Sequence, residues 1–590
     1  MSVFLTREEL NRKLWAAADI LRGAVDAADF KNHILSLLFL KRLSDVFDER
    51  REEIIKEYTR AGKSRAEAEE IANDPDEYGG GAYFIPEQSR WATLMNVGEN
   101  RAEAVDTALM AIEETNARYL EGVLAGVRFN DERRFGDPST LDGLMQRLLN
   151  HFSNIPLGNK NLLEPDVLGN SYEYLIERFA ETAGKKGGEF YSPRGAVRLL
   201  VEILDPQPGM RLNDPTCGSG GMLIECGHHV EERGGDPRNL TLTGQEKNRV
   251  TWAICKLNML LHGFPDADIR AGDTIRNPLF VLAGALERYH RVVANPPFSL
   301  KEWGQSEALT DPYKRFARGV PPKTKGDMAF LLHMVATTTD DGMVGVVMPH
   351  GVLFRGGQEG VIRESLIRDD LIEAVIGLPA NLFFGTGIPT ALLILNKKKS
   401  AARRGHVLFV DVSTDGLFEE SKSRSTLRSL DILRAASLYH GWAQPKAVES
   451  AMVRISDTWA TALERHRKNQ LARAGKSPEL TAAIETDFSD RLVEVQAARA
   501  NLEKWFAATH PKPDGGTRTS IEKHTAIVPI KTLLEEHEGN LNISRHVDPS
   551  DPPEQLNITA ELKRLRNLEK ERDAAEKRMD KLLKEFGYEG

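Results

Sequence analysis

The sequence has little cysteine and no long apolar run. Its three cysteines, Cys217, Cys226 and Cys255, form no CxxC pair and no Cys/His spacing suited to zinc, so we expect no structural metal site. Low cysteine usage is typical of a reducing cytoplasm. No apolar stretch approaches the roughly 20 residues of a membrane-spanning helix, and the N-terminus MSVFLTREEL lacks the apolar centre of a secretion signal. We therefore expect a cytoplasmic chain without a membrane anchor.

Positive charge is not in excess either. The net charge is −9, so the chain as a whole is not a generic nucleic-acid binder, and any DNA contact would depend on a local basic surface or a partner. With 41% hydrophobic and 28% charged residues, the composition is that of an ordinary globular protein. The length of 590 residues suggests about three to five domains.

Residues 1–165 are predicted to form an N-terminal all-helical domain. Apolar residues recur at helical spacing over Leu10–Leu21, Ile34–Phe47, Ala102–Leu124 and Leu141–Phe152. No catalytic cluster is evident in this region. A packing or partner-binding role is therefore favoured for it.

Residues 166–410 are predicted to form an α/β domain, because strand and helix patterns alternate there as in a mostly parallel sheet covered on both faces. The segment LPANLFFGTGIP between the last two expected strands lacks a helical pattern, so those two strands could pair antiparallel. The expected strands are Met210–Asn213, Leu240–Gln245, Ile269–Ala271, Arg291–Ala294, Met343–Met348, Leu371–Ile376 and Thr390–Leu395.

Residues 411–590 are predicted to be mainly helical. Helical patterns cover Leu427–His440, Ala451–Arg473 and Glu479–Phe506. The final stretch 558–586 carries apolar residues at near-heptad spacing among dense charges, which favours a coiled-coil seam with a partner helix. A solitary charged surface helix is the alternative.

One stretch suggests a ligand site. Arg291–Ala294 is a short β-branched strand that ends at Asn295-Pro296-Pro297-Phe298. Two prolines stiffen the chain, so an amide and an aromatic ring are presented rigidly at the carboxyl end of a strand, where α/β sheets bind ligands. An amide can donate and accept along a planar amino-bearing edge, and a ring can stack on its face. By itself the stretch fits a turn with a core phenylalanine equally well.

The three expected strands that precede Arg291–Ala294 also end in groups of polar residues. In RLNDPTCGSGGML the glycines after Asp214 let the backbone approach a ligand closely. The spacing differs from GxGxxG, and Asp214 would repel a pyrophosphate but attract an ammonium or sulfonium group. GQEKN places Glu246 where an acid accepts from ribose hydroxyls, and AGDT places Asp273 where it could accept from an adenine amino group.

Taken together, these motifs resemble the modification (M) subunit of type I restriction–modification systems, an S-adenosylmethionine-dependent DNA adenine-N6 methyltransferase. The resemblance extends over DVLGNSYEYLIERFA, GGEFYSPRGAV, DPTCGSGGML, GQEKN, AGDT, NPPF, KGDMAFLLHM, GMVGVVMPHGVLF and LNISRHVD. It implies a Rossmann-like class I methyltransferase sheet with helical flanks. It also implies a DNA substrate, a separate specificity subunit, a second M subunit and possible association with a restriction subunit in a prokaryotic cytoplasm.

The resemblance further implies residue roles. Asn295, Pro296, Pro297 and Phe298 would hold a flipped target base, and the asparagine favours adenine N6 over cytosine N4. The residues that would bind S-adenosylmethionine are Phe190, Tyr191, Pro193, Asp214, Thr216, Gly218, Ser219, Gly220, Glu246 and Asp273.

A basic segment after NPPF could face DNA. It interleaves cations with Trp303 and Tyr313, a combination that suits a nucleic-acid surface, although a solvated loop is the alternative. Its cations are Lys314, Arg315, Arg318, Lys323 and Lys325.

Three other functions remain open from the sequence. They are cytosine-N4 methylation, protein-glutamine methylation, because NPP-aromatic loops also grip side-chain amides, and a non-catalytic assembly role. The length of the helical flanks speaks against the second, and the intact polar set against the third.

Overall fold

The computed structural model describes residues 5–22, 27–79, 82–124, 126–131, 137–162, 167–183, 192–383, 387–414, 416–421, 424–444, 446–475, 477–513, 515–550 and 558–586. Within these ranges, no helix is long and apolar enough to cross a membrane. Nor do the described side chains include a cluster of three or more His, Cys, Asp or Glu able to hold a metal ion.

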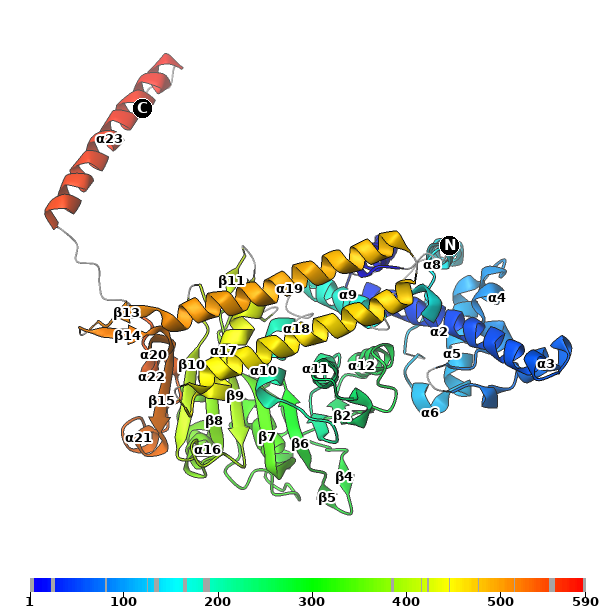
Figure 1. The fold of residues 1–590 in the computed structure, drawn as a ribbon, viewed down its shortest axis with the longest axis horizontal. Coiled ribbons are helices and arrows are strands. Elements are labelled where there is room, and N and C mark those ends of the chain that lie inside the picture. The colour runs from blue at the N-terminus through cyan, green and yellow to red at the C-terminus, as the bar shows by residue number, and fades with distance from the viewer. Residues whose placement is uncertain are drawn as a thin grey trace.

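The N-terminal part is helical, as expected. Thr6 caps its first helix through a capping box with Glu9, and Asp137 caps α8 just ahead of a proline at the first helical position. The helices are α1 (Arg7–Leu21), α2 (Ala27–Arg60), α3 (Arg65–Ile71), α4 (Trp91–Met95), α5 (Arg101–Thr115), α6 (Ala117–Leu120) and α8 (Pro138–Ser153). Their shared apolar core continues into α9 (Val167–Ala183) and α12 (Arg249–Leu261), so this region packs directly against the α/β part (Figure 1).

A nine-stranded sheet forms the centre of the molecule, in the order β15-β10-β8-β9-β7-β6-β1-β2-β3. Its strands are β1 (Arg211–Asp214), β2 (Thr241–Glu246), β3 (Asp268–Ala271), β6 (Tyr289–Ala294), β7 (Thr338–Pro349), β8 (Ile372–Gly377), β9 (Thr390–Asn396), β10 (His406–Asp411) and β15 (Thr525–Pro529). Strand β9 pairs antiparallel with β7 and β8, while β10, β8, β7, β6, β1, β2 and β3 share one direction. The predicted mostly parallel sheet, with its last expected strand antiparallel, is therefore confirmed.

Two strands of this sheet were not predicted. Strand β10 is a short apolar run, HVLFVD. Strand β15, TAIVP, lies at the edge of the sheet, and none of its residues is fully buried. β15 comes from the C-terminal region and pairs antiparallel with β10. Because an edge strand contacts the core on few positions, its sequence carries little of the apolar signal that marks an interior strand.

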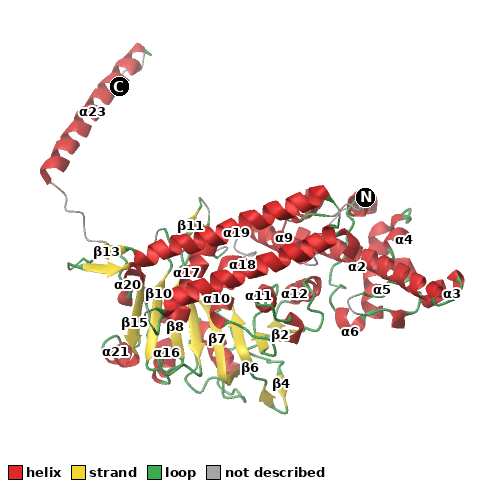
Figure 2. Ribbon diagram, viewed as in Figure 1, coloured by secondary structure: helices red, strands yellow, loops and turns green. Residues whose placement is uncertain are grey.

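Helices cover both faces of the sheet (Figure 2). One face packs against α10 (Arg194–Leu204), α11 (Gly221–Glu232) and α17 (Ser429–Gly441). The other packs against α14 (Asp327–Ala336), α16 (Gly357–Arg368) and the short α21 (Ile530–Glu535) and α22 (Ile543–His546). The remaining short elements are α13 (Gln305–Ala308), α15 (Gly351–Phe354), α20 (Ser520–His524) and the two-stranded ribbons β4–β5 (Val281–Leu282, Ala285–Leu286), β11–β12 (Glu419–Glu420, Ser425–Thr426) and β13–β14 (Thr509–Pro511, Thr517–Thr519).

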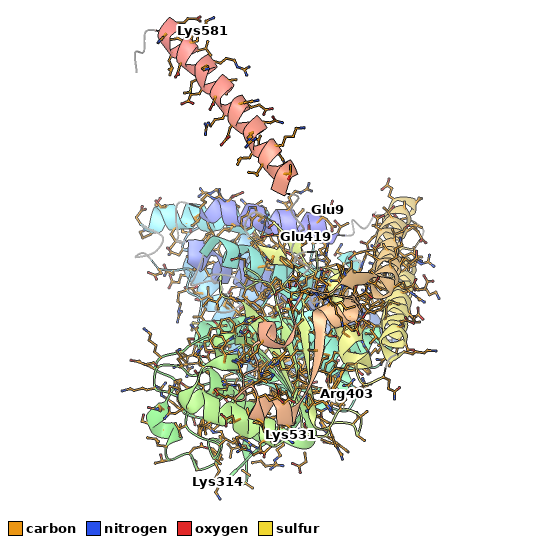
Figure 3. All side chains as sticks on the ribbon, turned by 90° about the vertical axis from the view of Figure 1, so that its left-hand side faces the viewer. Glu9, Lys314, Arg403, Glu419, Lys531 and Lys581 are labelled. Atoms are coloured by element: carbon orange, nitrogen blue, oxygen red, sulfur yellow. The ribbon has the colours of Figure 1, made fainter. Side chains whose placement is uncertain are left out.

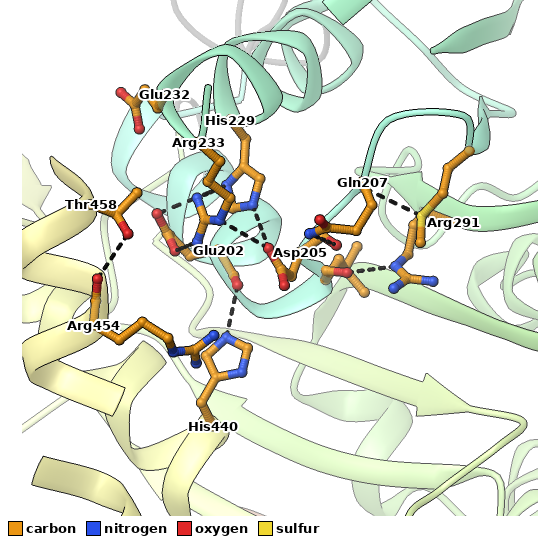
Figure 4. Close-up of polar contacts among 12 residues, drawn as sticks. Glu202, Asp205, Gln207, His229, Glu232, Arg233, Arg291, His440, Arg454 and Thr458 are labelled. Atoms are coloured by element: carbon orange, nitrogen blue, oxygen red, sulfur yellow. Dashed lines mark hydrogen bonds and ion pairs between the residues drawn. The ribbon is translucent and has the colours of Figure 1, made fainter. Parts of the chain in front are cut away.

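The long helices α18 (Ala447–Ala474) and α19 (Pro478–Ala507), both predicted, form a hairpin that a buried polar cluster joins to α10. Glu202 accepts hydrogen bonds from Trp459 Nε1 at 2.8 Å and Arg233 Nη2 at 2.9 Å. His440 Nε2 lies 2.9 Å from the Glu202 carbonyl oxygen (Figure 4). A buried carboxylate is costly unless it is paired. The bond between Glu202 and Trp459 of α18 therefore fastens the hairpin to α10.

The terminal helix α23 (Ile558–Glu585) stands clear of the body in Figures 1 and 3. Its apolar side chains are about half exposed, among them Leu562, Leu565, Leu568, Met579 and Leu582. The expected helix is therefore present, with its apolar seam open to solvent.

Candidate active site

Four neighbouring strands bring the expected polar residues to one edge of the sheet. Strands β6, β1, β2 and β3 lie side by side and run parallel, so their carboxyl ends meet at one edge. A cavity opens there. Its lining residues include Glu173, Ser192, Arg194, Asp214, Thr216, Cys217, Gly218, Ser219, Glu225 and Asn295.

The loop after β1 is shaped by its glycines. Gly218 and Gly220 have φ values of 52° and 87°, in the left-handed region that glycine adopts without penalty. A Cβ at Gly220 would also lie 2.9 Å from Cys255 Sγ. The amide of Asn258 donates to the Ser219 carbonyl oxygen at 2.9 Å. These features hold the loop close to α12 and leave its backbone facing the cavity.

Asp214 is the buried acid of this loop. It is 2% exposed, and its Oδ1 accepts from the Thr216 backbone N–H at 2.9 Å. Burial, together with the nearby Glu246 carboxylate, raises the pKa of Asp214 to about 7. The buried Thr216 hydroxyl has no hydrogen-bond partner among the described residues. Among the described residues, the loop thus presents a buried acid without a cationic partner, which suits a cationic ligand.

Glu246 and Asp273 end the next two strands. Glu246 accepts from the backbone N–H groups of Gly218 at 3.1 Å and Asn248 at 2.7 Å, and burial raises its pKa. Asp273 is more tightly paired. Burial raises the pKa of Asp273, but hydrogen bonds from Arg276 and the ion pair with Lys247 at 3.0 Å outweigh it and lower the pKa. Asp273 therefore reaches a ligand only if its cations rearrange.

Asn295 also lines this cavity. Its Nδ2 donates to Ser192 Oγ at 3.0 Å. Its Oδ1 is buried and has no hydrogen-bond partner among the described residues. An idle buried acceptor costs roughly 1–3 kcal/mol, so this oxygen is poised for a donor supplied by a ligand.

Phe298 follows the two prolines and is partly buried. Its ring packs edge-on against Phe383, with centroids 6.1 Å apart. Phe383 belongs to the LPANLFFGTGIP segment between β8 and β9, so the sheet positions both aromatic rings. The exposed part of the Phe298 ring remains available for stacking.

Comparisons with known proteins agree with this geometry. The model of the N-6 DNA Methylase family matches residues 163–471, and the HsdM N-terminal domain model matches residues 10–152. The chain belongs to the N-6 DNA methylase family. It is therefore an adenine-specific, S-adenosylmethionine-dependent DNA methyltransferase, as the sequence motifs predicted.

Individual relatives of this methylase are subunits of type I restriction enzymes. The MjaIX methylase subunit of Methanocaldococcus jannaschii is 31% identical over 71% of this chain and 74% of the relative. The HindI methylase subunit of Haemophilus influenzae is 31% identical over 61% of this chain and 82% of the relative. A crystal structure of a type I methyltransferase subunit from Streptococcus thermophilus has a TM-score of 0.67 and 25% identity, over 92% of this chain and all of the other. The predicted resemblance to type I M subunits is thus confirmed.

Sequence reasoning missed several residues of the methylase cavity. Glu173 on α9 and Glu225 on α11 add acidic groups to its wall, and Arg194 donates to Glu173 at 3.1 Å. Ser192, two residues ahead of α10, also lines the cavity. These residues come from helices whose sequence signal was amphipathic packing, and only the fold brings them to the cavity. Pro193 is buried at the start of α10, whereas Phe190 and Tyr191 lie outside the described residues.

The structure places Arg315, one of the predicted DNA-facing cations, among protein groups and not on the surface. Arg315 is 6% exposed, and its guanidinium donates to Asp311 and to the carbonyl oxygens of Thr274 and Ile275 at 2.7–3.0 Å. It fastens the loop to the end of β3. Arg318 pairs with Asp369. Sequence alone could not separate the buried Arg315 and the half-buried, paired Arg318 from solvated cations.

The other cations of the segment remain candidates. Lys314 and Lys323 are exposed and Lys325 is half-buried, and Lys314 reaches the outer edge of the body in Figure 3. Trp303, at the start of the segment, is buried and donates to the Pro322 carbonyl oxygen at 2.9 Å, which ties the two ends of the loop together.

Proposed function

We propose that this methyltransferase acts on an adenine flipped out of double-stranded DNA, as the modification subunit of a type I complex. The observation that carries the proposal is the buried, idle Asn295 Oδ1 beside the acidic cavity. An amino group inside a duplex cannot enter such a cavity, so the base must leave the stack at a cost of a few kcal/mol. Stacking on Phe298 would return about 1–3 kcal/mol.

The chemistry of the cavity suits S-adenosylmethionine, and this supports the proposed cofactor-binding residues. Asp214 and Glu225 give it acidic groups for a ligand with ammonium and sulfonium groups, while Glu173 is paired with Arg194, and the glycine loop lets the backbone approach closely. Thr216, Gly218, Ser219, Gly220, Glu246 and Asp273 complete the described set, with Phe190, Tyr191 and Pro193 proposed from the sequence. When bound, S-adenosylmethionine supplies a methyl group activated by its sulfonium.

Asn295 would orient the amino group of the target. The exocyclic nitrogen of adenine is a poor nucleophile because its lone pair is delocalised into the ring. Two acceptors, Asn295 Oδ1 and the Pro296 carbonyl oxygen, would hold its two hydrogens and favour a tetrahedral nitrogen with a localised lone pair. The rigid Pro296-Pro297 pair keeps these acceptors in place, so that positioning supplies much of the rate.

We also propose the partners. The described chain contains no pair of target-recognition domains, so a separate specificity subunit would select the sequence, with a second M subunit and possibly a restriction subunit completing the assembly in the prokaryotic cytoplasm. The exposed apolar seam of α23 would provide one contact, as a coiled-coil helix with its half-exposed leucines against a partner helix. Lys314, Lys323 and Lys325 would face DNA.

The experiment reconstitutes the chain with its specificity subunit, supplies methyl-labelled cofactor and duplex DNA, and identifies the labelled product after hydrolysis. We expect N6-methyladenine, and a rise in the fluorescence of 2-aminopurine placed at the target position on binding. Label in N4-methylcytosine or in a protein glutamine would contradict the adenine assignment. Full transfer without a fluorescence change would contradict base flipping.

A further inference from the structure

The chain leaves the NPPF motif through a strained residue. Ser299, directly after Phe298, has a φ of +53°, in the left-handed region that a serine occupies only at a conformational cost. Such a conformation persists only where the surroundings hold it. Whatever holds Ser299 also sets the direction in which the preceding ring and prolines project.

The group that holds it is the carboxylate of Asp327, the first residue of α14. Asp327 Oδ1 accepts the Ser299 backbone N–H at 2.7 Å, and the Asp327 side chain is 1% exposed. A charge-assisted hydrogen bond of this length is among the stronger ones in a protein. A second bond, from the Gly326 N–H to the Leu300 carbonyl oxygen at 3.0 Å, fastens the same two segments together.

The other neighbours of Asp327 also favour its hydrogen bond with the Ser299 backbone. A Cβ at Gly326 would lie 2.7 Å from Trp303 Cβ, so this glycine permits the close approach of helix and loop. Asp327 Oδ2 is buried without a hydrogen bond, and its nearest cation, Arg355, is 3.7 Å away and donates to Glu359 at 2.9 and 3.0 Å. The single strong bond of Asp327 is therefore the one to Ser299.

We infer that Asp327 is a positioning residue for methyl transfer, which fixes the backbone after Phe298 and thereby the clamp for the target base. The inference rests on the proposed role of Asn295 and Phe298. Between the Ser299 anchor and Asn295 stand two prolines and the Phe298 ring, which packs on Phe383. Because the prolines remove backbone freedom, holding Ser299 also limits how far Asn295 can move.

The test compares variants of the reconstituted complex in single-turnover methyl transfer at saturating cofactor and DNA, with cofactor affinity measured on the same preparations. Asp327→Ala removes the acceptor, and we expect the transfer rate to fall at least tenfold while the cofactor Kd stays within twofold. Asp327→Asn keeps an acceptor and should recover most of the rate. Glu359→Gln, which alters the same ionic cluster without touching Ser299, should keep the wild-type rate.

A rescue separates positioning from general stability. Ser299→Gly removes the cost of the left-handed conformation, so adding it to Asp327→Ala should restore part of the lost rate. A rate within twofold of wild type for Asp327→Ala would overturn the inference, and so would a parallel loss of cofactor binding or a loss that neither Asn nor the glycine recovers. Asn295→Ala, run alongside, keeps the two proposals apart: if it retains transfer, the proposed site itself is wrong.

Discussion

At the scale of single residues, the proposed contact of Asp214 with the cofactor would make cofactor binding depend on pH. Because burial raises the pKa of Asp214 to about 7, the carboxyl is largely protonated below that pH, and a cationic ligand must displace the proton before it gains the charge. Affinity for S-adenosylmethionine should therefore rise as pH increases from about 5.5 to 7.5, by up to about tenfold per unit below the pKa. Calorimetric titration of the chain at a series of pH values measures this.

The control for that effect is Asp214→Asn. It should bind the cofactor more weakly, with an affinity that no longer changes across the same window. A wild-type affinity that is flat between pH 5.5 and 7.5 would show that Asp214 does not face the cation.

The hydrogen bond between Ser192 and Asn295 orients the amide that we propose holds the target amino group. Its loss in Ser192→Ala would free the side chain to rotate, and a bond of about 0.5–1.5 kcal/mol corresponds to about a two- to twelvefold fall in methyl-transfer rate. Ser192→Thr keeps the hydroxyl and should stay near the wild-type rate. Equal rates for the alanine and threonine variants would remove the orienting role.

At the scale of elements, the loop between β6 and α14 contains two kinds of cation. Arg315→Ala leaves the buried Asp311 carboxylate unpaired, which typically costs about 3–5 kcal/mol, so this variant should unfold at a clearly lower temperature. Lys323→Glu removes an exposed cation, so it should leave thermal stability unchanged, weaken DNA binding and flatten the salt dependence. Thermal melts and DNA titrations at several salt concentrations separate the two. A stable Arg315→Ala with weakened DNA binding would reverse the assignment.

Elements with a strong local sequence pattern could be predicted, whereas features that depend on contacts between distant segments could not. Interior strands such as β1 and β9, and the long helices α18 and α19, carry strong periodic signals and were predicted close to their observed bounds. The strand ends at Asp214, Glu246 and Asn295 followed from the order of the motifs. Strand β15, the burial of Arg315 and the cavity positions of Glu173 and Glu225 depend on contacts between segments far apart in the chain, which local pattern does not encode.

At the scale of the whole molecule, α23 is separable from the catalytic body. Its side chains are exposed along the described helix, so removing residues 558–590 should leave the melting temperature and cofactor affinity unchanged. If the apolar seam contacts a partner helix, the same deletion should weaken assembly with the specificity subunit at least tenfold. Size-exclusion chromatography with light scattering, on the full chain and the deletion, measures this.

Substitutions in the full-length chain control for unrelated effects of the deletion. Leu565→Lys and Leu568→Lys place charges on the seam without shortening the chain and should give the same loss of assembly. Undiminished assembly by both forms would mean that α23 is a solitary surface helix.

The central claim is that the idle oxygen of Asn295 holds the amino group that receives the methyl. The most direct test measures cofactor affinity and single-turnover methyl transfer for Asn295→Ala in one reconstituted preparation. We predict a cofactor Kd within about twofold of wild type and a transfer rate at least 100-fold lower, which corresponds to about 2.7 kcal/mol of lost transition-state stabilisation. Transfer at the wild-type rate would contradict the account.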